Sequence, residues 1–239
     1  MDKNRIISLY QKGETAKEFD QDRSRYNYQK YKHYFESKIL KNIIAQMKEP
    51  IKILDVACGT GRMLPEVFMM KKMVKYVGLD TSESMTNILK QKAKKMNIEE
   101  DVKINFGDAT KIPFEDNSFD VVYSFHLLWH IPKEEQEKVI KEMIRVCKKE
   151  GIILFDSLNA DFIFDKIKKI TGKNGREGIH KLKIKEVKKI IGNKPIKIKK
   201  LLDAPIENNF LYSLINMINV LNKILPKKFF HMLYFTVKK

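Results

Sequence analysis

Three aspartates stand where an α/β protein holds a nucleotide-like ligand. Asp55 ends the apolar run "IKILD", and a loop of small residues, "VACGTG", follows it. Asp80 ends a second run, "KYVGLD", 25 residues further on, and Asp108 follows a third, "VKINF". Because the carboxyl ends of parallel strands meet at one edge of a sheet, these carboxylates are expected to face the same ligand.

The loop after Asp55 does not suit a phosphate. The dinucleotide fingerprint needs a third glycine at the place where Leu64 stands, and no Gly-Lys-Ser/Thr follows as a Walker loop requires. Asp55 would also oppose the charge of a pyrophosphate. S-adenosylmethionine fits instead, since it carries adenosine without phosphate and a cationic methionine end. Asp80 can accept hydrogen bonds from both ribose hydroxyls, and Asp108 can accept one from the adenine amino group.

Short β-rich runs alternate with helical patterns along the chain, which predicts βαβ units and a mainly parallel sheet. Strands are expected at 51–56, 75–80, 102–106, 119–125, 151–157, 196–202 and 231–237. Helices are expected at 24–47, 61–71, 84–96, 134–148 and 185–191. Two segments, 158–184 and 205–230, fall outside this alternation.

Five ordered motifs resemble the class I S-adenosylmethionine-dependent methyltransferases, above all the branch that acts on small molecules. They are "LDVACGTG" (54–61), "GLDTSESM" (78–85), "GDATKIPFEDNSFDVVYS" (107–124), "HLLWHI" (126–131) and "CKKEGIILFD" (147–156). The likeness covers 50–157 well and both 185–202 and 231–237 loosely. Ala57 stands where the family commonly has glycine, and alanine is a frequent substitute.

The resemblance implies an α/β fold of the Rossmann-like type. Its seven-stranded sheet would be mostly parallel, with helices on both faces, an antiparallel last strand, and helical caps from both ends of the chain. It further implies a single methyltransferase domain over 1–239. Within it, 1–47 would be an N-terminal helical lid, 48–157 the cofactor-binding core, and 158–184 and 205–230 substrate-cap insertions.

The resemblance also assigns residues to the parts of the cofactor. The methionine end would be lined by Asp55, Ala57, Cys58, Gly59 and Gly61; the ribose would be held by Asp80, with Thr81 and Met85 beside the adenosine; Gly107, Asp108 and Ala109 would meet the adenine; and Phe125 would lie next to the sulfonium. The methyl group would pass to an oxygen, nitrogen or carbon atom, leaving S-adenosyl-L-homocysteine. No metal is expected.

Two histidines follow the fourth expected strand and are the catalytic candidates. A neutral imidazole at His126 or His130 could take a proton from a hydroxyl or a polarised carbon acid. The alternative for each is a structural role, which is favoured at His130. In the leading segment 19–36, Arg23, Tyr26 and Tyr28 are candidate lid residues over the substrate; the alternative is an amphipathic helix that packs its aromatic residues on the sheet.

The formal charge of +17 raises the question of a nucleic-acid partner. Only six of the 47 basic residues are arginine, the usual reader of phosphates and base edges, so the charge reflects a lysine-rich surface. The Asn/Asp-Pro-Pro-Tyr/Phe signature of base amino-group methyltransferases is absent, because "SFHLLWH" follows the fourth strand. The expected acceptor is therefore a small, partly apolar metabolite, with no specific nucleic acid. An RNA-directed methyltransferase and a non-catalytic cofactor-binding subunit stay open as alternatives.

Partners and location are less marked in the sequence. The apolar segment 210–228 reads as core, as a cap on the substrate, or as a weak membrane-surface contact flanked by lysines. Cys58 and Cys147 have neither metal-ligand nor disulfide-scaffold spacing, and no run is long enough for a membrane span or a signal peptide. A cytoplasmic monomer or homodimer is the expectation.

Overall fold

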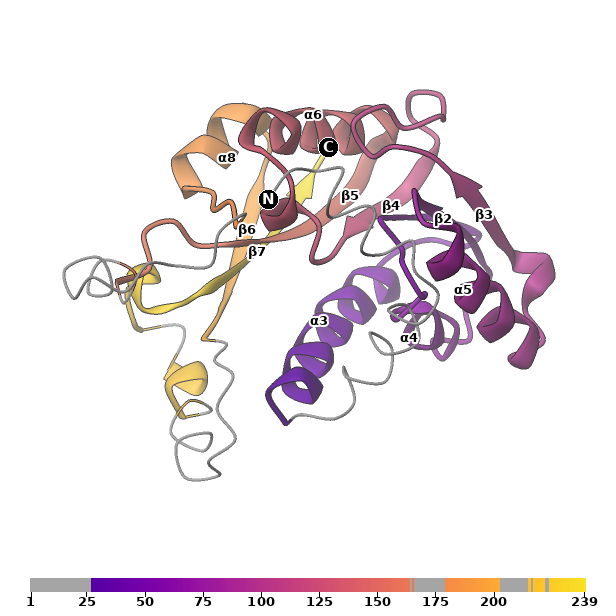
Figure 1. Ribbon diagram of the computed structural model, residues 1–239, viewed down its shortest axis with the longest axis horizontal. Helices are drawn as coiled ribbons and strands as arrows, with labels where there is room; N and C mark the ends of the chain where they lie inside the picture. Colours follow the sequence, from indigo (N-terminus) through magenta and orange to yellow (C-terminus); the bar gives the residue numbers. More distant parts are fainter. Residues whose placement is uncertain (1–26, 164, 166–178, 203–214, 216, 222–223) are drawn as a thin grey trace.

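A seven-stranded sheet forms the centre of the protein (Figure 1). The computed structural model describes residues 27–163, 165, 179–202, 215, 217–221 and 224–239. The strand order is β3-β2-β1-β4-β5-β7-β6, and β7 runs antiparallel to both of its neighbours, β5 and β6. The predicted fold class, including the antiparallel last strand, is confirmed.

The strands lie close to their predicted positions. They are β1 (Ile51–Val56), β2 (Val74–Asp80), β3 (Val102–Phe106), β4 (Phe119–Ser124), β5 (Cys147–Leu158), β6 (Ile196–Leu201) and β7 (Met232–Lys238). Every boundary except the start of β5 falls within one residue of the prediction. β5 begins at Cys147, which pairs with Phe119 before a register shift in β4, so the preceding helix ends at Val146 and not at 148.

The helices are α3 (Asn27–Ala45), α4 (Leu64–Phe68), α5 (Glu83–Lys95), α6 (Lys133–Val146) and α8 (Ile184–Ile191). Short 3-10 helices occur at η1 (Glu99–Asp101), η2 (Leu128–His130) and η4 (Lys227–Phe229). The predicted helix over 61–71 is wrong in extent, since only α4 forms. Gly59 and Gly61 have φ angles of 52° and 69°, in the left-handed region that a right-handed helix excludes.

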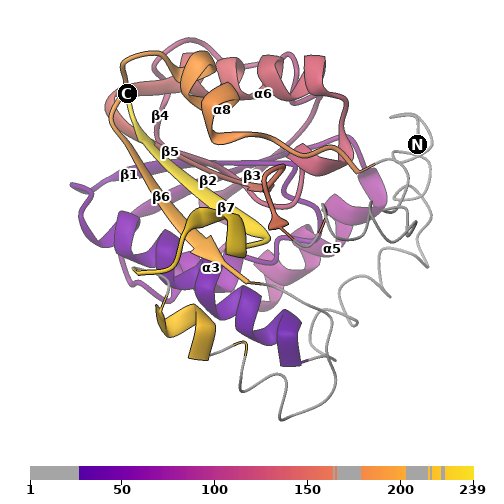
Figure 2. The same cartoon turned by 90° about the vertical axis from the view of Figure 1, so that its left-hand side faces the viewer.

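Two layers of helices cover the sheet (Figure 2). α3, α4 and α5 pack on one face, and α6 and α8 on the other. α6 buries an apolar stripe at helical spacing, and each of these side chains contributes roughly 1.5–3 kcal/mol. The stripe consists of Val139, Ile140, Met143 and Val146. The aliphatic half of α3 buries a similar stripe, made of Ile39, Leu40, Ile43 and Ile44.

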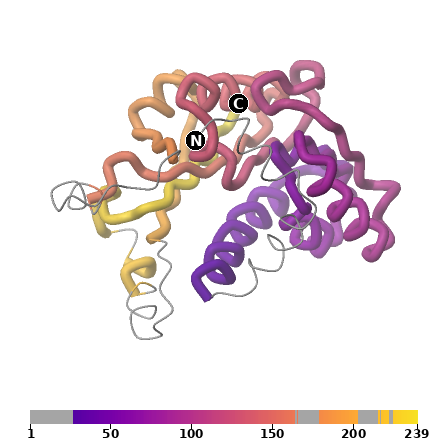
Figure 3. Tube along the Cα trace, in the orientation of Figure 1, coloured from indigo at the N-terminus to yellow at the C-terminus, as the bar shows by residue number. Residues whose placement is uncertain are grey.

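The strand order determines where a ligand can bind. β1 lies between β2 and β4, so the chain leaves β1 toward one edge of the sheet and returns beside it through β4. Figure 3 shows the result: the first half of the chain occupies one side of the molecule and the C-terminal strands the other. Ligands of open α/β sheets bind at such a switch point, outside the carboxyl ends of the strands. In the part of the chain described, no helix has the length and apolar character needed to cross a membrane.

Candidate functional site

A pocket opens at the carboxyl ends of β1, β2 and β4, at the switch point. Eleven of the twelve residues predicted to bind the cofactor line it: Asp55, Ala57, Cys58, Gly59, Asp80, Thr81, Met85, Gly107, Asp108, Ala109 and Phe125. Both candidate histidines, His126 and His130, line it too. Further lining residues were not predicted, among them Thr60, Arg62, Tyr123, Leu127, Ile131 and Val139.

The loop after β1 brings its backbone to the pocket. Ala57 has φ 59° and Gly59 has φ 52°, so the chain turns twice through the left-handed region. A Cβ placed on Gly59 would meet no protein atom within 4 Å, which leaves room there for a ligand. Gly61 has a different role. It is not among the lining residues, and a Cβ there would lie 2.6 Å from Cγ of Leu89, so Gly61 permits close packing of the loop on α5.

Asp80 connects β2 to this loop. Its Oδ2 accepts a hydrogen bond from the backbone N–H of Gly59 at 2.8 Å, and its Oδ1 accepts one from the N–H of Ser82 at 2.9 Å. Burial raises the pKa of the Asp80 carboxyl, and these backbone donors act against that shift. The carboxylate therefore orders the loop and stands at the edge of the pocket, where ribose hydroxyls would meet it.

Asp55 is held by two tyrosines that the sequence analysis did not single out. Tyr76 and Tyr123 both donate their hydroxyl protons to Oδ2 of Asp55, at 2.6 and 2.8 Å. Burial raises the pKa of Asp55 to about 7, although both hydrogen bonds oppose this effect. The strand register could have pointed to one partner, since Asp55 lies opposite Tyr123 in the sheet.

The affinity for S-adenosylmethionine is expected to rise with pH because of Asp55. The carboxyl is mostly neutral below its pKa of about 7, whereas a sulfonium and an ammonium favour the carboxylate. Binding then releases a proton, so affinity increases by up to about tenfold between about pH 6 and 8. Calorimetry across this range measures the effect. Asp55→Asn is the control for titration of the ligand's own ammonium, and an identical pH dependence in the two proteins would contradict the role of Asp55.

Asp108 lines the pocket from a self-contained turn. Its Oδ1 accepts hydrogen bonds from the backbone N–H and the hydroxyl of Thr110, at 2.8 and 2.9 Å. The N–H of Gly107 bonds the carbonyl of Asp80 at 3.0 Å, which ties this turn to the end of β2. The turn therefore presents Asp108 and Ala109 to the pocket from a position fixed by Asp80.

The two histidines differ in their surroundings. The Nε2 atom of His130 accepts a hydrogen bond from the indole N–H of Trp129 at 2.9 Å. His126 immediately follows Phe125 at the end of β4 and has a left-handed φ of 66°, which is uncommon for a residue with a side chain. Its Nε2 lies 2.7 Å from Oε1 of Glu36, and its backbone N–H bonds Oδ1 of Asp156 at 2.8 Å.

Glu36 was missed by the sequence analysis because it lies on α3, far from the pocket motifs. Its side chain is fully buried, and its Oε2 accepts a hydrogen bond from Arg62 at 2.6 Å. Tyr234 of β7 donates to its Oε1 at 3.0 Å. Although burial opposes ionisation, Arg62 and His126 hold the pKa of Glu36 well below its usual range. No local pattern distinguishes this glutamate from a solvent-exposed one.

Glu36, His126 and Asp156 lie close enough together to hold a metal ion, with ligand atoms within 4.8 Å of one another. The charges argue against a cation there. Glu36 already pairs with Arg62, and Lys32 lies near both acids. Burial, together with the charge of Glu36, raises the pKa of Asp156 to about 8, so this carboxyl is mostly neutral at pH 7.

Of the three lid candidates, Arg23 and Tyr26 lie outside the described residues. Tyr28 is half-buried on α3, and its hydroxyl accepts a hydrogen bond from Gln29 at 3.1 Å. It is not among the pocket-lining residues. α3 instead reaches the site through Glu36, one turn after His33, which is hydrogen-bonded to Arg62 at 2.8 Å.

A family model described as a methyltransferase domain matches residues 54–155. Residues 54–155 thus carry a methyltransferase domain, which agrees with the predicted family and with S-adenosylmethionine as its cofactor. Demethylmenaquinone methyltransferase of Staphylococcus aureus (strain MRSA252) is 38% identical over 112 residues, covering 45% of this chain and 43% of that protein. Demethylmenaquinone methyltransferase of Bacillus cereus (strain AH187) is 37% identical over 112 residues, covering 46% of each. The alignments thus span less than half of either relative.

Solved structures share the fold. The magnesium protoporphyrin IX methyltransferase from Synechocystis PCC 6803 with bound SAH superposes with a TM-score of 0.66 at 16% identity, covering 100% of both chains. Phosphoethanolamine N-methyltransferase 2 of Haemonchus contortus, in complex with S-adenosyl-L-methionine, superposes with a TM-score of 0.60 at 18% identity, covering 84% of this chain and 51% of that one.

Proposed function

We propose that this protein transfers a methyl group from S-adenosylmethionine to a small, partly apolar acceptor. The observation that carries the proposal is the convergence of Asp55, Asp80 and His126 on one pocket. When bound, the cofactor supplies an activated methyl group, so the protein has to align the two reactants and exclude water. The loop of Ala57 and Gly59 would hold the methionine end, Asp80 the ribose, and Asp108 with Ala109 the adenine.

The acceptor would enter beside His126. The pocket lining includes apolar residues, among them Phe125, Leu127, Ile131 and Val139, which suit a partly apolar acceptor. His126 would take the proton of an acidic hydroxyl or carbon acid as the acceptor attacks the methyl group. The names of the two aligned relatives make demethylmenaquinone the first acceptor to test.

The test combines binding with turnover. Calorimetric titrations with S-adenosylmethionine, S-adenosylhomocysteine and NAD should show binding of the first two alone. Transfer of a labelled methyl group is then measured with demethylmenaquinone and a panel of apolar phenols. Binding without turnover of any acceptor would favour the alternative of a non-catalytic cofactor-binding subunit, and binding of NAD in place of the sulfonium pair would overturn the assignment of the pocket.

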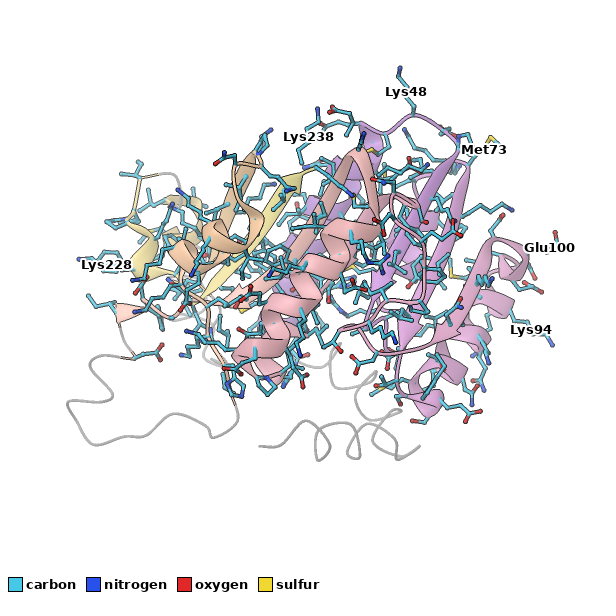
Figure 4. The ribbon with its side chains drawn as sticks, turned by 90° about the horizontal axis from the view of Figure 1, so that it is seen from above. Lys48, Met73, Lys94, Glu100, Lys228 and Lys238 are labelled. Atoms are coloured by element: carbon cyan, nitrogen blue, oxygen red, sulfur yellow. The ribbon has the colours of Figure 1, made fainter. Side chains whose placement is uncertain are left out.

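An RNA-directed activity is the second alternative. In Figure 4 the labelled Lys94 and Lys228 lie at opposite ends of the molecule, so these two charges do not belong to one cluster. A steep fall of RNA affinity with rising salt would instead support the RNA-directed alternative.

We also propose a weak membrane-surface contact through the C-terminal part of the chain. Val220 and Ile224 are each 81% exposed, and Lys227 and Lys228 follow them. Figure 1 shows the short helix at 217–220 beyond the ends of β6 and β7. Exposed apolar side chains next to lysines suit an anionic lipid surface.

Vesicle sedimentation tests this contact. The protein is expected to bind phosphatidylglycerol vesicles more than phosphatidylcholine vesicles, and Ile224→Glu should reduce that binding severalfold. Met73→Glu is the matched control, because Met73 is also exposed, at 68%, and lies on another side of the molecule from Lys228 (Figure 4). Equal loss in both variants would argue against a specific contact at 217–228.

The remaining parts of the proposal concern organisation. α3 would act as part of an N-terminal lid over 1–47, the core would extend over 48–157, and 158–184 and 205–230 would cap the acceptor, all within one domain. Cys58 and Cys147 are both buried free thiols, which supports a reducing compartment such as the cytoplasm. Analytical sedimentation would distinguish the two expected oligomeric states, a monomer and a homodimer.

A further inference from the structure

Behind the pocket, α3, β4, β5 and β7 meet around one buried carboxylate. Oε1 of Glu36, on α3, lies within hydrogen-bond distance of Nε2 of His126, which follows β4, and accepts a hydrogen bond from the hydroxyl of Tyr234 in β7. Its Oε2 accepts a hydrogen bond from Arg62, in the loop between β1 and α4. Asp156 of β5 completes the group, since its Oδ1 bonds the backbone N–H of His126. Of these five residues, Arg62 and His126 line the pocket. Glu36, Tyr234 and Asp156 do not line it.

The second oxygen of Asp156 marks the site as unusual. Asp156 is 1% exposed, and within the described residues its Oδ2 has no hydrogen-bond partner. This oxygen points toward His126, with 3.8 Å between it and Nε2. An unsatisfied buried oxygen is destabilising, which is more typical of a functional site than of a core.

We propose that Glu36 is a positioning residue that holds His126 for proton removal and stabilises the imidazolium that results. This inference rests on the proposed function of the pocket. With Nε2–H donated to Glu36, the lone pair of the ring lies on Nδ1, which makes Nδ1 the proton acceptor. Asp156 holds the backbone of His126 in its left-handed conformation. Because its carboxyl is mostly neutral at pH 7, it adds no second negative charge beside the imidazole ring.

The step balances without a further reactant. The bond between the acceptor atom and its hydrogen breaks, and the proton moves to His126. The electron pair left on the acceptor forms the bond to the methyl carbon, while the carbon–sulfur bond breaks with its electrons on sulfur. The negative charge of Glu36 then faces the new positive charge on the ring at 2.7 Å.

The sole tryptophan allows a test that needs neither cofactor nor acceptor. The ring centroids of Trp129 and His126 are 5.1 Å apart, and an imidazolium quenches indole fluorescence. Trp129 also bonds His130, so the titration is made in the full chain carrying His130→Asn, where His126→Asn should abolish the pH transition. Adding Glu36→Gln should move its midpoint down by about one pH unit, because the charge that favours the imidazolium is lost.

Three variants separate positioning from mere structural support. Tyr234→Phe removes a competing donor from the same oxygen of Glu36 and should move the midpoint slightly upward, opposite to Glu36→Gln. Asp156→Asn should move the midpoint less than Glu36→Gln does. Glu66→Gln is the matched control, because Glu66 contacts His33 and Lys41 of α3 without touching His126. It should leave the midpoint in place.

Among the described residues, the groups around His126 include Glu36 and Lys32 of α3, Arg62, Asp156, Tyr234 and the neighbouring Trp129. An unmoved midpoint in Glu36→Gln, or shifts of the same sign in Glu36→Gln and Tyr234→Phe, would overturn the proposal. A transition that changes on addition of Mg²⁺ or Zn²⁺ would assign the cluster to a metal and overturn it as well. Because no methyl transfer is measured, failure here leaves the proposed function standing, and an absent turnover leaves this titration valid.

Discussion

Replacing Asp80 with alanine is expected to weaken the binding of S-adenosylmethionine by about 1.5–3 kcal/mol, or roughly ten- to 150-fold. The variant loses the proposed acceptor for the ribose hydroxyls. It also loses the acceptor that fixes the N–H groups of Gly59 and Ser82, so the loop would no longer be held against β2. Both losses act in the same direction, and calorimetric titration with S-adenosylmethionine and S-adenosylhomocysteine measures their sum.

Two further variants define the origin of this effect. Asp80→Asn keeps one oxygen for hydrogen bonding but not the charge, and its affinity should fall between those of the wild type and Asp80→Ala. Asp101→Ala removes an exposed acid that pairs with Lys75 at 2.6 Å, away from the pocket, and should leave binding unchanged. A folded Asp80→Ala protein with wild-type affinity would show that Asp80 does not hold the ribose.

Replacing His126 with asparagine is expected to lower kcat by about 10²- to 10⁴-fold for an acceptor that must lose a proton. Asparagine tolerates the left-handed φ of 66° better than most residues, so the backbone hydrogen bond to Asp156 should survive. Binding of S-adenosylhomocysteine should change little, because the loss concerns proton removal and not the cofactor. Single-turnover transfer of a labelled methyl group, with the acceptor found by the screen, measures the effect.

His130→Asn provides the comparison for this experiment. His130 also lines the pocket, yet its Nε2 accepts a hydrogen bond from the indole N–H of Trp129, which gives it a structural role. Its replacement should cost kcat less than that of His126. Equal losses in the two variants, or an unchanged kcat in His126→Asn, would remove His126 from the proton-transfer role. The acceptor would then attack without a base, as a neutral amine can.

Local sequence was sufficient to predict the strands. The runs that became β1 and β3 have the predicted bounds, because their apolar residues and their flanking turn residues are contiguous in the chain. The loop between β1 and α4 was harder. The helix expected from residue 61 begins only at Leu64, because the left-handed conformations of Gly59 and Gly61 are a property of the loop and leave no mark in apolar spacing.

Asp55, Asp80, Asp108 and His126 could be placed at one site from the sequence alone. Each follows or ends a predicted strand, and parallel strands carry their carboxyl ends to the same edge, so topology brings these residues together whatever the details of packing. What only the tertiary structure decided is which groups stand behind them. Tyr76 and Tyr123 reach Asp55 across the sheet, and Glu36 reaches His126 from a helix 90 residues earlier. These contacts depend on side-chain packing between distant segments, which no local pattern records. Burial raises the pKa of Asp55, whereas Arg62 and His126 lower that of Glu36 against the effect of burial.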